Sequence, residues 1–180
     1  MDLTPEEMKE GIRKFLKREE QNKYYAAKEE EYRGRTATNN LQLDIQWADR
    51  TEAVDVDFLV SRLTIDGFEN FEENFMVINL DLDQVVNYVC EGEDLANEMY
   101  SIDKLWDTNQ CETKIIDLIT YVEEGKIVCP PVIDVVSDSG KDLLVIYDGN
   151  HRIALSRYLR LVSIPFIVRR TNELRIRALL

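Results

Sequence analysis

Asp148-Gly149-Asn150-His151-Arg152 is the stretch around which residues 129–170 are organised. The run before it, Leu143–Tyr147, is apolar at almost every position and therefore predicts a buried strand. Asp148 and Gly149 break that run, and beyond them the apolar residues recur at helical spacing. The sequence thus predicts a strand, a tight turn, and a helix whose first turn contains His151 and Arg152.

Two more strands are predicted on either side of this turn. Pro130-Pro131 opens the apolar run Val132–Val136, and the small polar residues of 137–141 are typical of a hairpin turn. The run Ser163–Val168 follows the helix. The pattern therefore predicts a hairpin, the helix, and a final strand.

The first turn of this helix has the features of an anion site. Unpaired N–H groups and the positive end of the helix dipole favour an anion there. Glycine lets a ligand approach the backbone, arginine offers a planar donor fork, and histidine can titrate near neutrality. We therefore expect phosphate binding by the five residues of the turn: Asp148, Gly149, Asn150, His151 and Arg152.

The same five residues allow a purely structural interpretation. Asp148 could cap the helix and pair with Arg152, while His151 forms a hydrogen-bonded wall of the core. The position of the turn, after a hairpin and before a helix, favours the anion site. A buried turn with no cavity beside it would favour the structural interpretation.

Several short motifs occur in a fixed order along residues 115–168. A helix ends at Gly125, Pro130-Pro131 begins a strand, a hairpin leads to the D-G-N-H-R turn, and the last strand contains Ile164-Pro165-Phe166. In this order the chain resembles the ParB/sulfiredoxin superfamily. That superfamily includes CTP-hydrolysing partition proteins, sulfiredoxins, free-serine kinases and proteins described as nucleases. The D-G-x-H-R turn is most similar to that of the free-serine kinases.

The resemblance implies an α+β fold and a bound nucleotide. It predicts a ParB/sulfiredoxin-like domain over residues 75–180, preceded by an N-terminal helical and mixed extension over residues 1–74. The expected ligands are ATP, ADP or CTP with Mg²⁺, and the metal ligands are left open. Sulfiredoxins carry a cysteine where this chain has Asn150, so reduction of a sulfinic acid is not expected.

The resemblance also brings two carboxylates to the predicted site. In the resembling fold, the segment before the helix Glu112–Glu124 returns beside the turn, which would place Asp107 and Glu112 near a bound phosphate. Either could act as a general base or help to hold Mg²⁺. The predicted catalytic residues are therefore Asp107, Glu112 and His151, the only histidine in the chain.

The composition of the chain limits the classes of partner that we expect. The chain has 180 residues and a formal charge of −13. Residues 141–180 hold eight basic and three acidic residues, a charge of +5, which leaves −18 on residues 1–140. This balance makes direct DNA binding unlikely. Three widely spaced cysteines support neither a disulfide framework nor a zinc site. Without a signal peptide or a long apolar run, we expect a cytoplasmic protein with no membrane segment.

The extension begins with a strong helix signal. Thr4 caps a helix that Pro5 opens and Gly34 ends, and its charged second half could dock on a protein partner. The alternation in Leu41–Trp47 predicts a half-buried strand. Val54–Phe58 alternates likewise, although Phe58–Ile65 could also be helical.

Three functions remain open from the sequence. The first is a nucleotide-binding protein that hydrolyses or transfers a phosphate at the turn. The second is a non-catalytic regulatory or interference protein that engages a partner through its acidic surface. The third is a metal-dependent nuclease, which the superfamily suggests and the charge disfavours.

Overall fold

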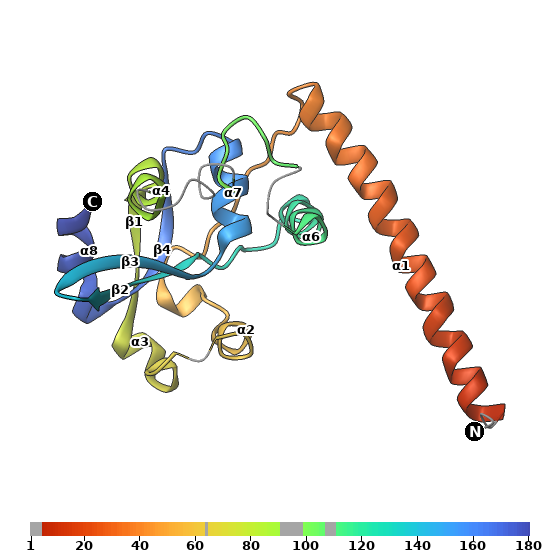
Figure 1. Cartoon of the computed structure of the whole chain (residues 1–180), viewed down its shortest axis with the longest axis horizontal. Helices are drawn as coiled ribbons and strands as arrows, with labels where there is room; N and C mark the ends of the chain where they lie inside the picture. The colour runs from red at the N-terminus through yellow and green to blue at the C-terminus, as the bar shows by residue number, and fades with distance from the viewer. Residues whose placement is uncertain (1–4, 64, 91–98, 107–110) are drawn as a thin grey trace. The chain divides into compact units, whose positions relative to one another are not determined.

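The computed structural model describes residues 5–63, 65–90, 99–106 and 111–180 (Figure 1). The chain divides into two compact units, Met1–Leu41 and Gln42–Leu180. This boundary lies before residue 42, whereas the sequence suggested one after residue 74. Residues 42–74 join the second unit because Val54, Leu59 and Phe68 pack in one apolar cluster with residues of the sheet.

The first unit consists mainly of helix α1, Pro5–Ala37. It extends three residues beyond the glycine at which we expected it to end. Glu10 pairs with Lys14 and Glu29 with Arg33, each one helical turn apart, which stabilises an exposed helix modestly. Ile12, Phe15 and Leu16 form an exposed apolar stripe on its N-terminal half.

The second unit is built on a four-stranded mixed sheet with strand order β1-β4-β2-β3. The strands are β1 (Phe75–Asp81), β2 (Val132–Asp138), β3 (Lys141–Asp148) and β4 (Ser163–Arg169). β2 and β3 form the predicted antiparallel hairpin, and β1 is antiparallel to β4. β4 runs parallel to β2 in the middle of the sheet. The predicted α+β class is confirmed.

Helices cover one face of this sheet. They are α4 (Leu82–Cys90), α7 (Asn150–Tyr158) and α8 (Glu173–Leu179), and their buried residues pack with Ile133, Val135 and Phe166. Asp81 caps α4 by accepting the N–H of Gln84. The sequence did not predict α8, which is short. Two hydrogen bonds from the Arg175 guanidinium to the Asp142 carboxylate join it to β3.

Residues 42–74 cover the other face with short elements. These are η1 (Thr51–Ala53), α2 (Val56–Val60), η2 (Phe68–Asn70) and α3 (Phe71–Asn74). Phe68, Phe71 and Phe75 pack as one aromatic cluster. Helix α6, Glu112–Glu123, matches the predicted helix and packs against α7.

One prediction in the extension needs correction. Leu43–Trp47 alternates between partly buried and exposed residues, but only Trp47 pairs, in a single parallel bridge with Val128. The strand predicted at Leu41–Trp47 is therefore wrong, because no strand in the described part of the chain pairs with it beyond this bridge. In the following domain, the sequence also favours a short helix over residues 94–100, most of which lie outside the described residues. None of the described helices is both long and apolar enough to span a membrane.

Candidate functional site

Gly149 is the single residue between β3 and α7. It stands at the N-cap of α7 with φ +106, a left-handed conformation that favours glycine. A Cβ atom built at Gly149 would lie 2.6 Å from Cβ of Pro131. The missing side chain therefore makes room for the start of β2. This corrects our expectation that it leaves space for a ligand.

Arg152 is a structural cation. Its side chain is buried, and Nη1 donates to the carbonyl oxygens of Cys129 and Pro130 at 2.6 and 3.1 Å. Nη2 donates to Oδ2 of Asp148. These partners use three of the five N–H donors of the guanidinium, so Arg152 cannot offer the fork of its two terminal nitrogens to a phosphate without giving up internal bonds. Its expected role as a phosphate ligand is thereby weakened.

Asp148 is an ion-pair partner of two arginines. Besides Arg152, Nη2 of Arg62 lies 3.8 Å from Oδ1 of Asp148. The N-cap residue of α7 is Gly149, and no side chain caps the helix. The capping role considered for Asp148 is therefore wrong, while the pairing with Arg152 is confirmed.

Asn150 and His151 are both anchored to neighbouring segments. The hydroxyl of Tyr100 donates to Oδ1 of Asn150 at 2.8 Å, and the N–H of Cys111 donates to Nε2 of His151 at 3.1 Å. Burial, with Lys114 as a smaller cause, lowers the pKa of His151 to about 4. His151 is therefore neutral at pH 7, which corrects the expectation that it titrates near neutrality.

The first turn of α7 nevertheless keeps open donors. The first backbone bond of α7 is donated by Ile153 to Gly149, so the N–H groups of residues 150–152 precede the helical ladder. Among the described residues, none of these three groups has an acceptor. Lys114, in the first turn of α6, lies near enough to His151 for its charge to lower the pKa of the imidazole. It forms no ion pair with any described residue.

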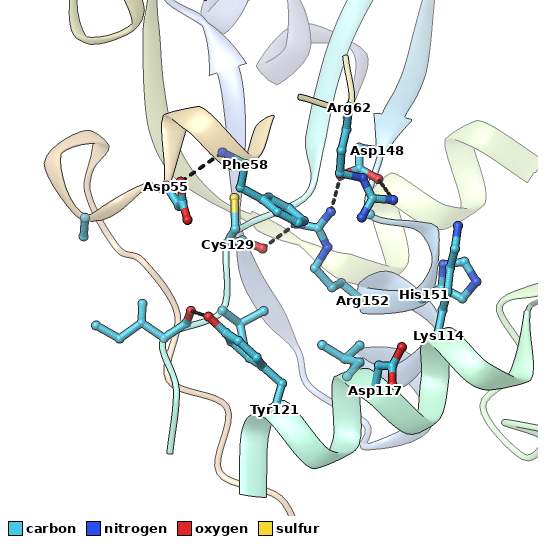
Figure 2. Close-up of a pocket in the computed structure, with 15 residues that line it drawn as sticks. Asp55, Phe58, Arg62, Lys114, Asp117, Tyr121, Cys129, Asp148, His151 and Arg152 are labelled. Carbon is cyan, nitrogen blue, oxygen red and sulfur yellow. Dashed lines mark hydrogen bonds and ion pairs between the residues drawn. The ribbon is translucent and has the colours of Figure 1, made fainter. Parts of the chain in front are cut away.

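A cavity of about 430 Å³ lies beside the turn (Figure 2). It is lined by η1, α2 and the residues that flank α2, by α6 and residues 127–129 ahead of β2, and by the end of β3 and the start of α7. Its charged and polar lining is Asp55, Arg62, Lys114, Asp117, Asp148, His151 and Arg152. Its remaining lining is Ala53, Phe58, Leu118, Tyr121, Ile127, Val128, Cys129 and Gly149. The turn is thus buried in part, but it does form a wall of a cavity.

Several lining residues were not singled out from the sequence. Phe58 and Arg62 come from the segment after residue 42, and Lys114, Asp117 and Tyr121 come from α6. The i, i+3 and i, i+7 spacing of the three α6 residues does place them on one helix face, a signal that could have been read. Phe58 and Arg62 belong to no motif, and only the fold brings them to the turn.

Neither of the two other predicted catalytic residues, Asp107 and Glu112, can be placed in the cavity. Asp107 lies outside the described residues. Glu112 begins α6 and is half-buried, but it does not line the cavity. Burial raises the pKa of Cys129 to about 11, so the thiol in the cavity wall is protonated at neutral pH.

The described side chains that could bind a metal ion do not form a metal site by themselves. No group of three His, Cys, Asp or Glu side chains that could hold a metal is found in the described part of the chain. Of the carboxylates lining the cavity, Asp148 is paired with arginines and Asp55 accepts the N–H of Phe58 to cap α2. The described residues therefore do not fit a protein-held Mg²⁺ ion.

No protein-family model, curated protein or solved structure matches this chain. The function must therefore be argued from the cavity and its lining.

Proposed function

We propose that the cavity beside residues 148–152 binds a nucleotide. The observation that carries the proposal is one cavity that combines aromatic side chains with a lysine that pairs with no described carboxylate, next to the open first turn of α7. The phosphate would lie at the start of α7, and the base would lie between the side chains of α2 and α6.

Lys114 and the α7 backbone support the phosphate position. Lys114 brings a full positive charge that no described carboxylate neutralises. The open N–H groups at the start of a helix, with its dipole, favour a phosphate oxygen. Arg62 can add a second cation, because its 3.8 Å pairing with Asp148 is long and its side chain is 41% exposed.

Phe58 and Tyr121 support the position of the base. They come from α2 and α6 and both line the cavity (Figure 2). Each side chain is partly exposed, although Arg62 lies over the Phe58 ring and Lys126 over the Tyr121 ring, so each would offer its other face to a planar ligand. Stacking of a nucleobase on an aromatic side chain contributes about 1–3 kcal/mol per base in single-stranded nucleic-acid complexes.

The resemblance to the ParB/sulfiredoxin superfamily supports the same ligand class. The order β2, β3, the D-G-N-H-R turn, α7 and β4 follows the order of motifs on which that resemblance rests. In that superfamily the turn binds nucleotide phosphates. Here Arg152 is committed to internal bonds, so the binding role passes to Lys114, Arg62 and the backbone of the turn.

Phosphate chemistry is the second part of the proposal. His151 is neutral, and with Nε2 accepting from Cys111 its proton lies on Nδ1, so it acts as a donor rather than a base. Asp117 lines the cavity one turn along α6 from Lys114. We therefore propose Asp117 as the general base for water or an acceptor hydroxyl, and Mg²⁺, if used, would arrive on the nucleotide.

A ligand sensor without turnover is the second candidate. It is favoured because Asp148, Asn150 and Arg152 are bonded to other parts of the fold, as expected of a rigid binding wall. Such a sensor could signal to a protein partner through α1, whose Ile12, Phe15 and Leu16 are exposed. A nuclease remains disfavoured by the formal charge of −13.

The test is calorimetric titration of AMP, ADP, ATP and CTP into wild type, Lys114→Gln and Lys141→Gln, with and without Mg²⁺. Lys141 is the matched control, because it is exposed at the start of β3 and does not line the cavity. We expect Lys114→Gln to weaken binding at least tenfold and Lys141→Gln to leave it unchanged. Absence of nucleotide binding by wild type removes the proposal.

The same titrations separate binding from turnover. Phosphate release that disappears in Asp117→Asn supports the catalytic form of the proposal. Binding without phosphate release supports the sensor. Binding of duplex DNA that weakens steeply with salt would revive the nuclease.

A further inference from the structure

We infer that the preferred ligand of this cavity is a nucleoside monophosphate, bound without a divalent cation. The inference rests on the proposed function and narrows it, because the expectation from resemblance was ATP, ADP or CTP with Mg²⁺. It is carried by the charges that line the cavity and by the cavity's size.

The positive charge available to a phosphate is small. Arg152 and Asp148 neutralise each other through their ion pair, which leaves Arg62 and Lys114 as the other cations of the lining. Arg62 is held in part by the same Asp148 carboxylate. Lys114, together with about +0.5 from the start of α7, therefore supplies most of the charge.

This charge matches one phosphate group. A phosphate monoester carries about −1.5 to −2 at pH 7, close to what Lys114 and the helix dipole can balance with help from Arg62. Each added phosphate brings more negative charge and no further described cation of the lining to meet it. A polyphosphate would also have to share the cavity with the carboxylates of Asp55 and Asp117.

A divalent cation could offset that excess only if the protein helped to hold it. Mg²⁺ in nucleotide sites is usually held by one or two carboxylates as well as by phosphate oxygens. Asp148 and Asp55 already accept bonds from Arg152 and from the N–H of Phe58. Asp117, the third lining carboxylate, is not free either, and it is the residue that we assign to catalysis.

The volume of the cavity agrees with a small ligand. Its 430 Å³ lies in the lower part of the range of roughly 300–1,000 Å³ that is usual for ligand pockets. Much of its lining is apolar, including Phe58, Tyr121 and Ile127. A base on these side chains and one phosphate at the start of α7 use both ends of such a cavity.

The test compares ligands that differ only in phosphate number. Adenosine, AMP, ADP, ATP and inorganic phosphate are titrated into the full chain by calorimetry, once in EDTA and once with Mg²⁺, and CMP, GMP and UMP extend the series to other bases. We expect AMP or another monophosphate to bind in EDTA at least tenfold more tightly than its triphosphate, and Mg²⁺ to change its affinity less than twofold. Adenosine and inorganic phosphate should each bind at least tenfold more weakly than the best nucleotide.

Two variants connect this preference to the cavity. Lys114→Gln should weaken monophosphate binding at least tenfold and adenosine binding hardly at all, whereas Phe58→Ala should weaken both. Lys141→Gln, outside the cavity, should change neither.

The outcomes distinguish this inference from the function on which it rests. Triphosphate with Mg²⁺ binding as tightly as, or more tightly than, the monophosphate overturns the inference and leaves nucleotide binding intact. No binding of any nucleotide overturns both.

Discussion

The backbone N–H of Cys111 donates to Nε2 of His151 across 3.1 Å, joining the start of α6 to the start of α7. This bond fixes which nitrogen of the imidazole is unprotonated, because a backbone N–H can only donate. It also keeps Lys114, three residues beyond Cys111, beside the first turn of α7. Two helix N-termini thus meet at one wall of the cavity.

The first prediction concerns pH. The pKa of His151 is lowered from 6.5 to about 4, chiefly by burial. The unfolded chain therefore takes up a proton near pH 6.5, whereas the folded chain does not until about pH 4. The stability that His151 contributes is fully present above pH 6.5 and is lost as the pH falls toward 4. Because the side chain is only half-buried, we expect a loss of about 1–2 kcal/mol.

Chemical denaturation of wild type and His151→Gln between pH 7 and pH 4 measures this loss. The variant should show a shallower decline, since its amide does not titrate and the carboxylates are common to both proteins. His151 is the only histidine, so one imidazole signal in NMR spectra reports its pKa directly. A measured pKa of 6 or above would contradict the buried, neutral imidazole.

The second prediction separates two roles of glycine. Gly149 has φ +106 and faces Pro131, whereas Gly140, in the β2–β3 turn, has φ +81 with no atom within 4 Å of a built Cβ. Gly140→Ala should cost about 1–2 kcal/mol from the left-handed backbone alone. Gly149→Ala should cost clearly more in urea denaturation, because the start of β2 must also move. Equal costs would show that the contact with Pro131 is easily relieved.

The third prediction concerns thiol reactivity. Cys111 is exposed, and its pKa is lowered, first by its bond with the Thr113 hydroxyl and then by the Lys114 N–H. The thiol of Cys129 is largely buried, with its pKa raised to about 11. Iodoacetamide at pH 7 should therefore modify Cys111 well before Cys129, as followed by peptide mass spectrometry. Thr113→Val should slow the labelling of Cys111 and leave Cys129 unchanged.

The elements around the turn could be predicted from the sequence because their signals are local. Val132–Asp138, Lys141–Asp148 and Ser163–Arg169 are short apolar runs bounded by turn residues, and the chain between them has helical spacing. The strand predicted at Leu41–Trp47 failed for a non-local reason. Alternation reports which residues are buried, but only a neighbouring strand decides whether they pair.

The sequence predicted where the candidate site lies, but not which residues form it or what they contact. The turn does line a cavity, yet the fates of Arg152 and His151 depend on distant partners, the carbonyl of Cys129 and the N–H of Cys111. No local pattern in the turn encodes those contacts. One of the two aromatic side chains in the cavity, Phe58, comes from a segment more than 80 residues upstream of the turn, so only the folded chain brings it there.

The last prediction decides whether Arg152 serves the fold or the ligand. Arg152→Met removes the donors to Cys129, Pro130 and Asp148 while keeping an unbranched side chain. It leaves two carbonyl oxygens and a carboxylate without this partner, so we expect a loss of about 3–5 kcal/mol of unfolding free energy.

Arg160→Met is the control, because Arg160 is exposed and pairs only weakly with Asp103 at 3.5 Å. It should change stability by less than about 0.5 kcal/mol. If Arg152→Met instead unfolds like wild type but no longer binds nucleotide, then Arg152 exchanges its internal partners for a phosphate. In that case the charge available in the cavity would be larger than Lys114 and the α7 dipole supply, and a polyphosphate would fit.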